Sequence, residues 1–141
     1  MLSVLRLEEP DRVPHFEWEF SVEVIEALNG SRDYFNFIEL MDIDAVMVAP
    51  RYRTKKIGTD LLLDEWGATR RRGVEDTALP VDDLAPIKTM ADMEAWHPPD
   101  PDDPYRYEDV QAAIDRFGGE RAVFLQIRDV WSGPRDYIGY A

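Results

Sequence analysis

Residues Ala45 to Ala49 read AVMVA, an unbroken apolar run with the length of one β-strand. Such a run is typical of a strand that is covered on both faces, as in a parallel sheet. Residues 122–127 (AVFLQI) form a second run of the same kind. Helical patterns flank both runs, and strands that alternate with helices indicate an α/β fold with parallel pairing.

Periodicity predicts the elements around these two runs. Residues 13–20 (VPHFEWEF) alternate, with Phe16, Trp18 and Phe20 on one face, which predicts a third strand. Apolar spacing predicts helices over 21–28, 34–41, 90–96 and 107–117, and a last helix that begins near Ser132. Residues 60–66 and 68–72 form a short hairpin around Gly67 in this interpretation.

Three small parallel strands would leave sheet edges exposed, although these strands are apolar enough to favour burial on both faces. The chain has 141 residues, whereas a (β/α)8 barrel typically needs about 250. One interpretation is a small three-layer α/β domain. The preferred one is a single domain over residues 1–141 that forms the N-terminal part of a TIM barrel, an incomplete barrel of parallel strands with covering helices whose C-terminal part is missing.

Composition limits the classes of partner. The formal net charge is -13, so a nucleic acid or an anionic membrane surface is an unsuitable general partner, because binding phosphates requires a basic surface. No apolar run approaches the roughly 20 residues of a membrane span. The chain contains no cysteine and its N-terminus lacks the pattern of a signal peptide, so a cytoplasmic setting is expected.

Positive charge is nevertheless uneven along the chain. Seven of the 16 Lys and Arg residues lie between Arg51 and Arg72, and three of them end the stretch DEWGATRRR at residues 64–72. Two interpretations stay open. These arginines, with Arg51 and Arg53, could rim a site for an anionic ligand, or they could neutralise Asp64, Glu65 and the acids at positions 75 and 76.

Five stretches carry a family likeness in their order and spacing. They are DRVPHFEWEF (11–20), MDIDAVMVAP (41–50), LLLDEWGATRRR (61–72), LPVDDLAPIKTMADMEAWHPPDP (79–101) and AVFLQIRDVWSGPRDYIG (122–139). In that order the chain resembles the N-terminal portion of the uroporphyrinogen decarboxylase (URO-D) superfamily. The DEWG element followed by the Pro-Ile and Pro-Asp-Pro stretches is most similar to the branch of corrinoid-dependent methyltransferases and demethylases.

The resemblance implies a (β/α)8 barrel and one of two activities. Members of the superfamily decarboxylate uroporphyrinogen in porphyrin biosynthesis, a lyase reaction, or transfer methyl groups to or from a corrinoid protein or a thiol, often with zinc. The family's zinc ligands lie in the later part of the barrel, so no metal ligand and no bound cofactor are expected in this chain. Zinc and a cobalamin-type corrinoid partner are expected for a full-length enzyme.

Two departures from the decarboxylase pattern bear on the choice between these activities. Glu19 and Glu23 occupy the positions where decarboxylases carry arginines for substrate carboxylates, and the run AVMVA leads into Pro50 and Arg51 where the family has a catalytic Asp. Methyl transfer is therefore the preferred activity. An authentic uroporphyrinogen decarboxylase and a non-catalytic, truncated binding or assembly domain are the alternatives. A homodimer is among the expected assemblies.

Candidate site residues come from the predicted strands and their ends. Glu19 is the first candidate for a catalytic residue, with His15 and Glu17 on the same strand face as substrate contacts or metal ligands; the alternative is a solvated polar face. In α/β barrels the site lies at the carboxyl ends of strands. The residues that follow two strands are therefore candidates too, with Asp129 as catalytic and the others as contacts to a small-molecule substrate: Arg51, Tyr52, Arg53, Arg128 and Trp131. A solvated basic loop and a buried ion pair are the alternatives for these two groups.

Overall fold

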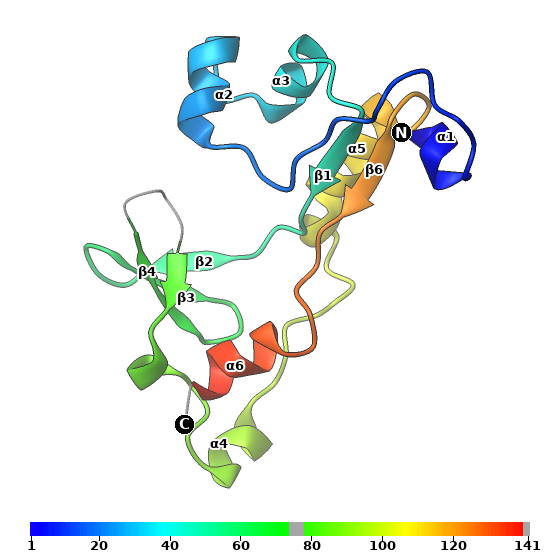
Figure 1. The fold of residues 1–141 in the computed structure, drawn as a ribbon. Helices are drawn as coiled ribbons and strands as arrows, with labels where there is room; N and C mark the ends of the chain where they lie inside the picture. Colours follow the sequence, from blue (N-terminus) through cyan, green and yellow to red (C-terminus); the bar gives the residue numbers. More distant parts are fainter. Residues whose placement is uncertain (74–77, 140–141) are drawn as a thin grey trace. The chain divides into compact units, whose positions relative to one another are not determined.

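The computed structural model describes residues 1–73 and 78–139, and it divides into two compact units. Unit 1 comprises residues 1–50 and 107–126. Unit 2 comprises the described part of residues 51–106 and the residues from 127 onward. The chain thus leaves unit 1 after residue 50, returns to it at residue 107 and leaves it again after residue 126, and each unit is described by itself (Figure 1).

Unit 1 is built around a parallel pair of strands. Strand β1 (Ala45–Val48) pairs with β6 (Ala122–Leu125), in a register that sets Ala45 opposite Ala122 and Val48 opposite Leu125. Helix α5 (Glu108–Phe117) precedes β6 and packs on both strands. The helices α1 (Leu2–Leu5), α2 (Val22–Asn29) and α3 (Tyr34–Leu40) come before β1.

The helix ends of unit 1 follow from local chemistry. Asp33 caps α3, because its carboxylate accepts a hydrogen bond from the backbone N–H of Asn36. Gly30 ends α2 in the left-handed conformation at φ 69°, which glycine adopts without a steric cost.

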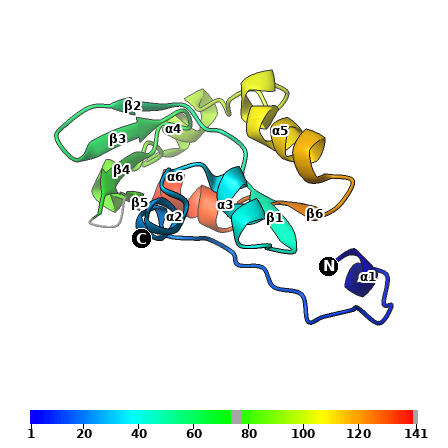
Figure 2. The same cartoon turned by 90° about the horizontal axis from the view of Figure 1, so that it is seen from above.

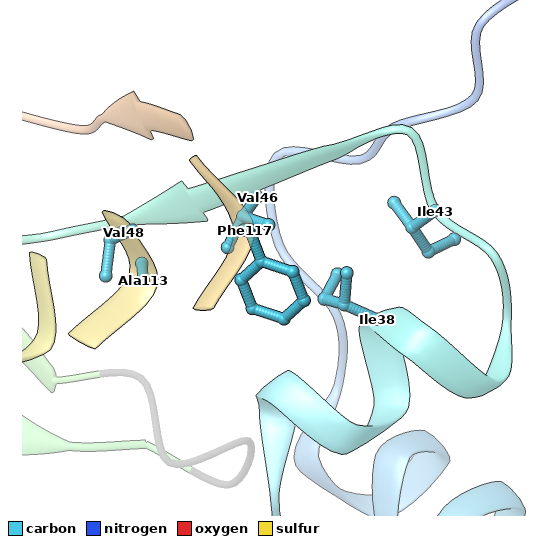
Figure 3. Packing of buried hydrophobic residues seen from close by; sticks show 6 residues of the cluster. All are labelled: Ile38, Ile43, Val46, Val48, Ala113 and Phe117. Atoms are coloured by element: carbon cyan, nitrogen blue, oxygen red, sulfur yellow. The ribbon is translucent and has the colours of Figure 1, made fainter. Parts of the chain in front are cut away.

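The core of unit 1 joins β1 to the inner faces of α3 and α5. Figure 3 shows the buried side chains that form it, which are Ile38, Ile43, Val46, Val48, Ala113 and Phe117. The ring of Phe35 meets that of Phe117 edge to face at 5.4 Å, and Phe20 meets Phe37 in the same way at 5.0 Å.

Unit 2 contains a four-stranded antiparallel sheet in the order β2-β3-β4-β5. Its strands are β2 (Thr54–Lys56), β3 (Leu61–Asp64), β4 (Thr69–Arg72) and β5 (Ala78–Pro80), and Figure 2 shows the first three as neighbours. The remaining elements of the unit are the 3₁₀ helices η1 (Asp82–Leu84) and η2 (Pro104–Tyr107), α4 (Met90–Ala95) and α6 (Ser132–Ile138). Helix η2 ends where the chain re-enters unit 1.

The prediction of an incomplete TIM barrel of parallel strands is wrong. The described residues form one two-stranded parallel sheet and one four-stranded antiparallel sheet, and the barrel prediction has no place for the second. The expected parallel pairing holds only for β1 and β6. The predicted hairpin around Gly67 is present as β3 and β4.

Residues 13–20 are extended but form no strand. Their backbone is tied to the start of β1 at one point, where the N–H of Asp44 donates to the carbonyl of His15 and the Asp44 carboxylate accepts from the N–H of His15. The alternating aromatic residues still find partners, since Phe16 lies 5.4 Å from Phe124 and Phe20 packs on Phe37. Trp18 stays 61% exposed. Alternation therefore predicted neither the strand nor a buried face, since Phe16 and Trp18 are exposed and Phe20 is only partly buried.

We predict that Ile38→Ala destabilises the protein by about 2–5 kcal/mol, because it removes a fully buried side chain and leaves a cavity between α3 and β1. Ile114→Ala is the matched control. This side chain is 48% exposed on α5, so its loss should cost less than about 1 kcal/mol. Urea unfolding followed by far-ultraviolet circular dichroism measures both values. Equal losses would contradict the assignment of the core.

Candidate functional site

The turn between β3 and β4 is organised by Asp64, the first residue of DEWGATRRR. One oxygen of its carboxylate, Oδ1, accepts hydrogen bonds from the backbone N–H groups of Trp66 at 3.0 Å and Ala68 at 2.9 Å. Gly67 adopts φ 87°, and a Cβ at this position would lie 3.3 Å from Pro86. A glycine is therefore required by both the backbone conformation and the close contact.

Arg70 connects this turn to helix α6. Its Nε donates to Oδ2 of Asp64 at 3.0 Å, and its Nη2 donates to Oδ2 of Asp136 at 2.7 Å. The Asp136 side chain is fully buried, and it also accepts from Arg128 at 2.7 Å and Arg135 at 3.0 Å. We call these five residues the arginine–aspartate cluster.

The charges of this cluster are closely balanced. Three guanidinium groups face the carboxylates of Asp64 and Asp136, and Asp129 is near enough to Arg128 for the two charges to interact. A buried carboxylate is stable only when it is paired and hydrogen-bonded, and Asp136 meets this condition. The cluster has the character of a structural ion network rather than of an anion site.

Four aromatic rings of unit 2 pack near the cluster. Tyr52 meets Trp66 edge to face at 4.7 Å, and the ring of Tyr137 stacks on Trp66 at 6.3 Å and on Trp96 at 5.5 Å. The indole N–H of Trp96 donates to the carbonyl of Trp66 at 2.9 Å. Burial, followed by the charge of Asp64, raises the pKa of Tyr137 to about 12.

Arg51 and Arg53, predicted as ligand contacts, lie against other residues of unit 2. The guanidinium of Arg53 forms an ion pair with Asp103 and lies 4.5 Å from the centre of the Tyr105 ring. That of Arg51 lies 5.7 Å from the same ring. The hydrogen bond with Asp103 raises the pKa of Arg53 and lowers that of Asp103.

The glutamate that follows Asp64 is paired as well. Glu65 binds Arg106 through two hydrogen bonds of 2.7 and 3.0 Å, and Arg106 is 5% exposed. Arg71 lies 3.3 Å from Asp60. The interpretation in which the arginines of 64–72 neutralise nearby acids thus holds for Arg70 with Asp64, whereas Glu65 has a different partner. The pairing predicted with the acids at positions 75 and 76 involves residues outside the described ranges.

Arg128, Asp129 and Trp131 follow β6 and belong to unit 2. Arg128 joins the cluster and also donates to the carbonyl of Ser132 at 2.9 Å. The Asp129 carboxylate accepts from the backbone N–H groups of Ser132 and Trp131, which lower its pKa. Trp131 is 68% exposed and stands at the N-cap of α6, which begins at Ser132. The catalytic role of Asp129 stays a prediction.

The predicted strand-face residues lie in unit 1 and are exposed. The His15 Nε2 atom is 3.8 Å from a carboxylate oxygen of Glu17. Glu19 makes no ion pair or side-chain hydrogen bond with any residue in the ranges 1–73 and 78–139. The catalytic role of Glu19 also remains a prediction.

Sequence reasoning grouped Arg51, Tyr52 and Arg53, and Arg128 with Asp129, as neighbours in the chain, and their roles as site residues stay predictions. It missed Asp136, the most heavily paired carboxylate, and Arg106. Asp136 occupies a polar position in a short helix next to Arg135, and no periodicity marks it as buried. Of its two other partners, Arg128 precedes the helix in the same segment and Arg70 is remote in the sequence, so no local signal marks the pairing with Arg70.

We predict that Asp136→Asn destabilises the protein by about 3–5 kcal/mol, because it removes the negative charge from three arginines and turns an amide N–H toward guanidinium donors. Asp60→Asn is the control. It changes an exposed partner of Arg71 and should cost at most about 1 kcal/mol. Thermal and urea unfolding compare the two variants. A near-neutral Asp136→Asn would contradict the role of the buried carboxylate.

Because the pKa of Tyr137 is raised, we predict that the protein loses stability at alkaline pH. The pKa of this phenol is higher in the folded protein than in the unfolded chain, so above about pH 10 the unfolded state releases a proton that the folded state keeps. The free energy of unfolding should therefore fall between about pH 10 and 12. Tyr137→Phe should reduce this fall, whereas Tyr107→Phe should not. Urea unfolding across this pH range gives the slopes, and equal slopes for both variants would refute the prediction.

The rest of the described chain limits the kinds of site further. None of the helices in residues 1–73 and 78–139 combines the length and the apolar character needed to cross a membrane. Within the same ranges no three His, Asp or Glu side chains are grouped so that they could hold a metal ion.

No family model, curated protein or solved structure matches this chain.

Proposed function

We propose that the chain functions in methyl transfer to or from a corrinoid protein, as its resemblance to the URO-D superfamily implies. The proposal is supported by the order and spacing of the five stretches between residues 11 and 139. The described residues do not form the (β/α)8 barrel that the likeness implies, so the proposal rests on the sequence likeness alone.

Methyl transfer is favoured over porphyrinogen decarboxylation because candidate arginines are already paired with carboxylates of the protein. A substrate with several carboxylates needs cationic side chains that can turn to it. Arg53 is held by Asp103 and Arg128 by Asp136, both within unit 2. In unit 1, Glu19 and Glu23 are exposed at the positions where decarboxylases carry arginines, and they would repel such a substrate.

The described residues do not fit the zinc ion that the resemblance implies. Zinc in proteins is held by three or four His, Cys, Asp or Glu side chains. Cysteine is absent from the sequence, and the described residues offer no group of three such ligands. We therefore derive no step through zinc, and the proposal assigns to the chain the binding and orientation of the reactants, with Glu19 as the candidate general acid or base.

The proposal predicts that the protein accelerates demethylation of methylcobalamin by a small thiol. The visible absorption spectrum of the corrinoid reports the reaction, and the rate without protein is the reference. In parallel, uroporphyrinogen is incubated with the protein and its carboxylated products are separated by chromatography. Unchanged methylcobalamin together with decarboxylated porphyrinogen would replace the proposal by the decarboxylase alternative. Inactivity in both assays would contradict it as well.

Glu19→Gln tests the predicted catalytic residue. A general acid or base contributes about 100-fold or more to a rate, so the variant should lose at least about tenfold in activity. Its fold should be unaffected, because Glu19 is exposed and has no ionic partner in the described residues. Glu120→Gln, another exposed glutamate of unit 1, is the control. Equal activity of the two variants would remove Glu19 from the site.

A further inference from the structure

Unit 1 contains a cavity of about 470 Å³ at the carboxyl end of β1. This volume lies in the range of pockets that bind small molecules. The cavity is lined by residues from the start of α3, the end of β1 and the first turn of α5, which are Asp33, Tyr34, Phe35, Met47, Val48, Ala49 and Asp109.

The walls of this cavity are fixed by the core. Val48 is 7% exposed and belongs to the core cluster, and Figure 3 shows it beside Ala113 of α5. The Tyr34 hydroxyl accepts a hydrogen bond from the backbone N–H of Met47 at 3.3 Å, which ties the start of α3 to β1. Phe35 is held edge to face on Phe117. The cavity is thus walled on one side by packed elements and open on the other, where Asp33 and Ala49 are exposed.

The lining combines aromatic and apolar walls with negative charge. Five of the seven side chains are apolar or aromatic, two are carboxylic acids, and none is basic. Oδ1 of Asp33 caps α3 by accepting from Asn36, and its Oδ2 accepts no hydrogen bond from the described residues. Arg116, the cation whose charge acts on Asp33, is bound by Glu39 at 2.6 and 2.9 Å.

We propose that this cavity binds a small organic cation that carries methyl groups, such as a trimethylammonium compound. Methyl groups match the apolar walls, the aromatic rings of Tyr34 and Phe35 attract a cation through their faces, and the two carboxylates complement its charge. An anion would be repelled, and a neutral apolar ligand would make no use of the carboxylates. The proposal goes beyond methyl transfer, because it concerns binding alone.

Choline and its neutral isostere 3,3-dimethylbutanol test the proposal, because they share shape but differ in charge. Isothermal titration of the whole chain should show binding of choline and at least about tenfold weaker binding of the isostere, a difference of about 1.4 kcal/mol. Equal affinities, or no binding of choline, would overturn the proposal. Neither result depends on the methylcobalamin assay, so the two proposals can fail separately.

Three Asp→Asn variants locate the binding site. Asp33→Asn removes the charge but retains helix capping, because asparagine caps as well as aspartate does. Asp33→Asn and Asp109→Asn should each weaken choline binding about fivefold or more. Asp115→Asn is the control on α5, since this exposed residue does not line the cavity. Unchanged binding in the first two variants, or equal loss in all three, would refute the assignment.

Discussion

The parallel pairing of β1 with β6 is the constraint on which the rest of the structure depends. Two parallel strands cannot be joined by a tight turn, so the chain must leave the end of β1 and return to the opposite end of the sheet before β6 begins. Here the return is made by α5, which packs on both strands. The strands of the antiparallel sheet of unit 2 belong to the connection between β1 and α5, within residues 51–106.

Unit 2 is closed by ionic and aromatic contacts between segments that are distant in sequence. Residues 51–106 and the helix α6 meet through Arg70 and Asp136, and through the stacking of Tyr137 on Trp66 and Trp96. The apolar core of this unit includes small side chains such as Ala68 and Ala85. A buried ion network adds little net stability compared with apolar packing, but removing one of its charges is costly. Through this network Arg70 joins strand β4 to helix α6.

The sequence predicted the elements whose signals are local. The apolar stripes of α3 and α5 and the apolar runs of β1 and β6 were sufficient to locate them. Strand β2 was missed because TKK is exposed along its whole length, and β5 because it ends in a proline. The barrel prediction was wrong because apolar runs indicate burial without stating how many strands share the sheet. Within the candidate site, the sequence pattern around the hairpin singled out Arg70. Asp136 could be recognised as a site residue only from the tertiary structure.

The distribution of charge decides what kind of ligand this protein attracts. The basic stretch of residues 51–72 first indicated an anion site, but its arginines are engaged locally, as Arg53 is by Asp103, Arg70 by Asp64 and Arg71 by Asp60. Since each of these pairs is neutral, the unpaired charge of the chain, whose net charge is -13, is mainly negative. Such a field repels polyanions and raises the local concentration of cations. The same field that weighs against a porphyrinogen substrate favours a cationic ligand in the cavity beside Asp33 and Asp109.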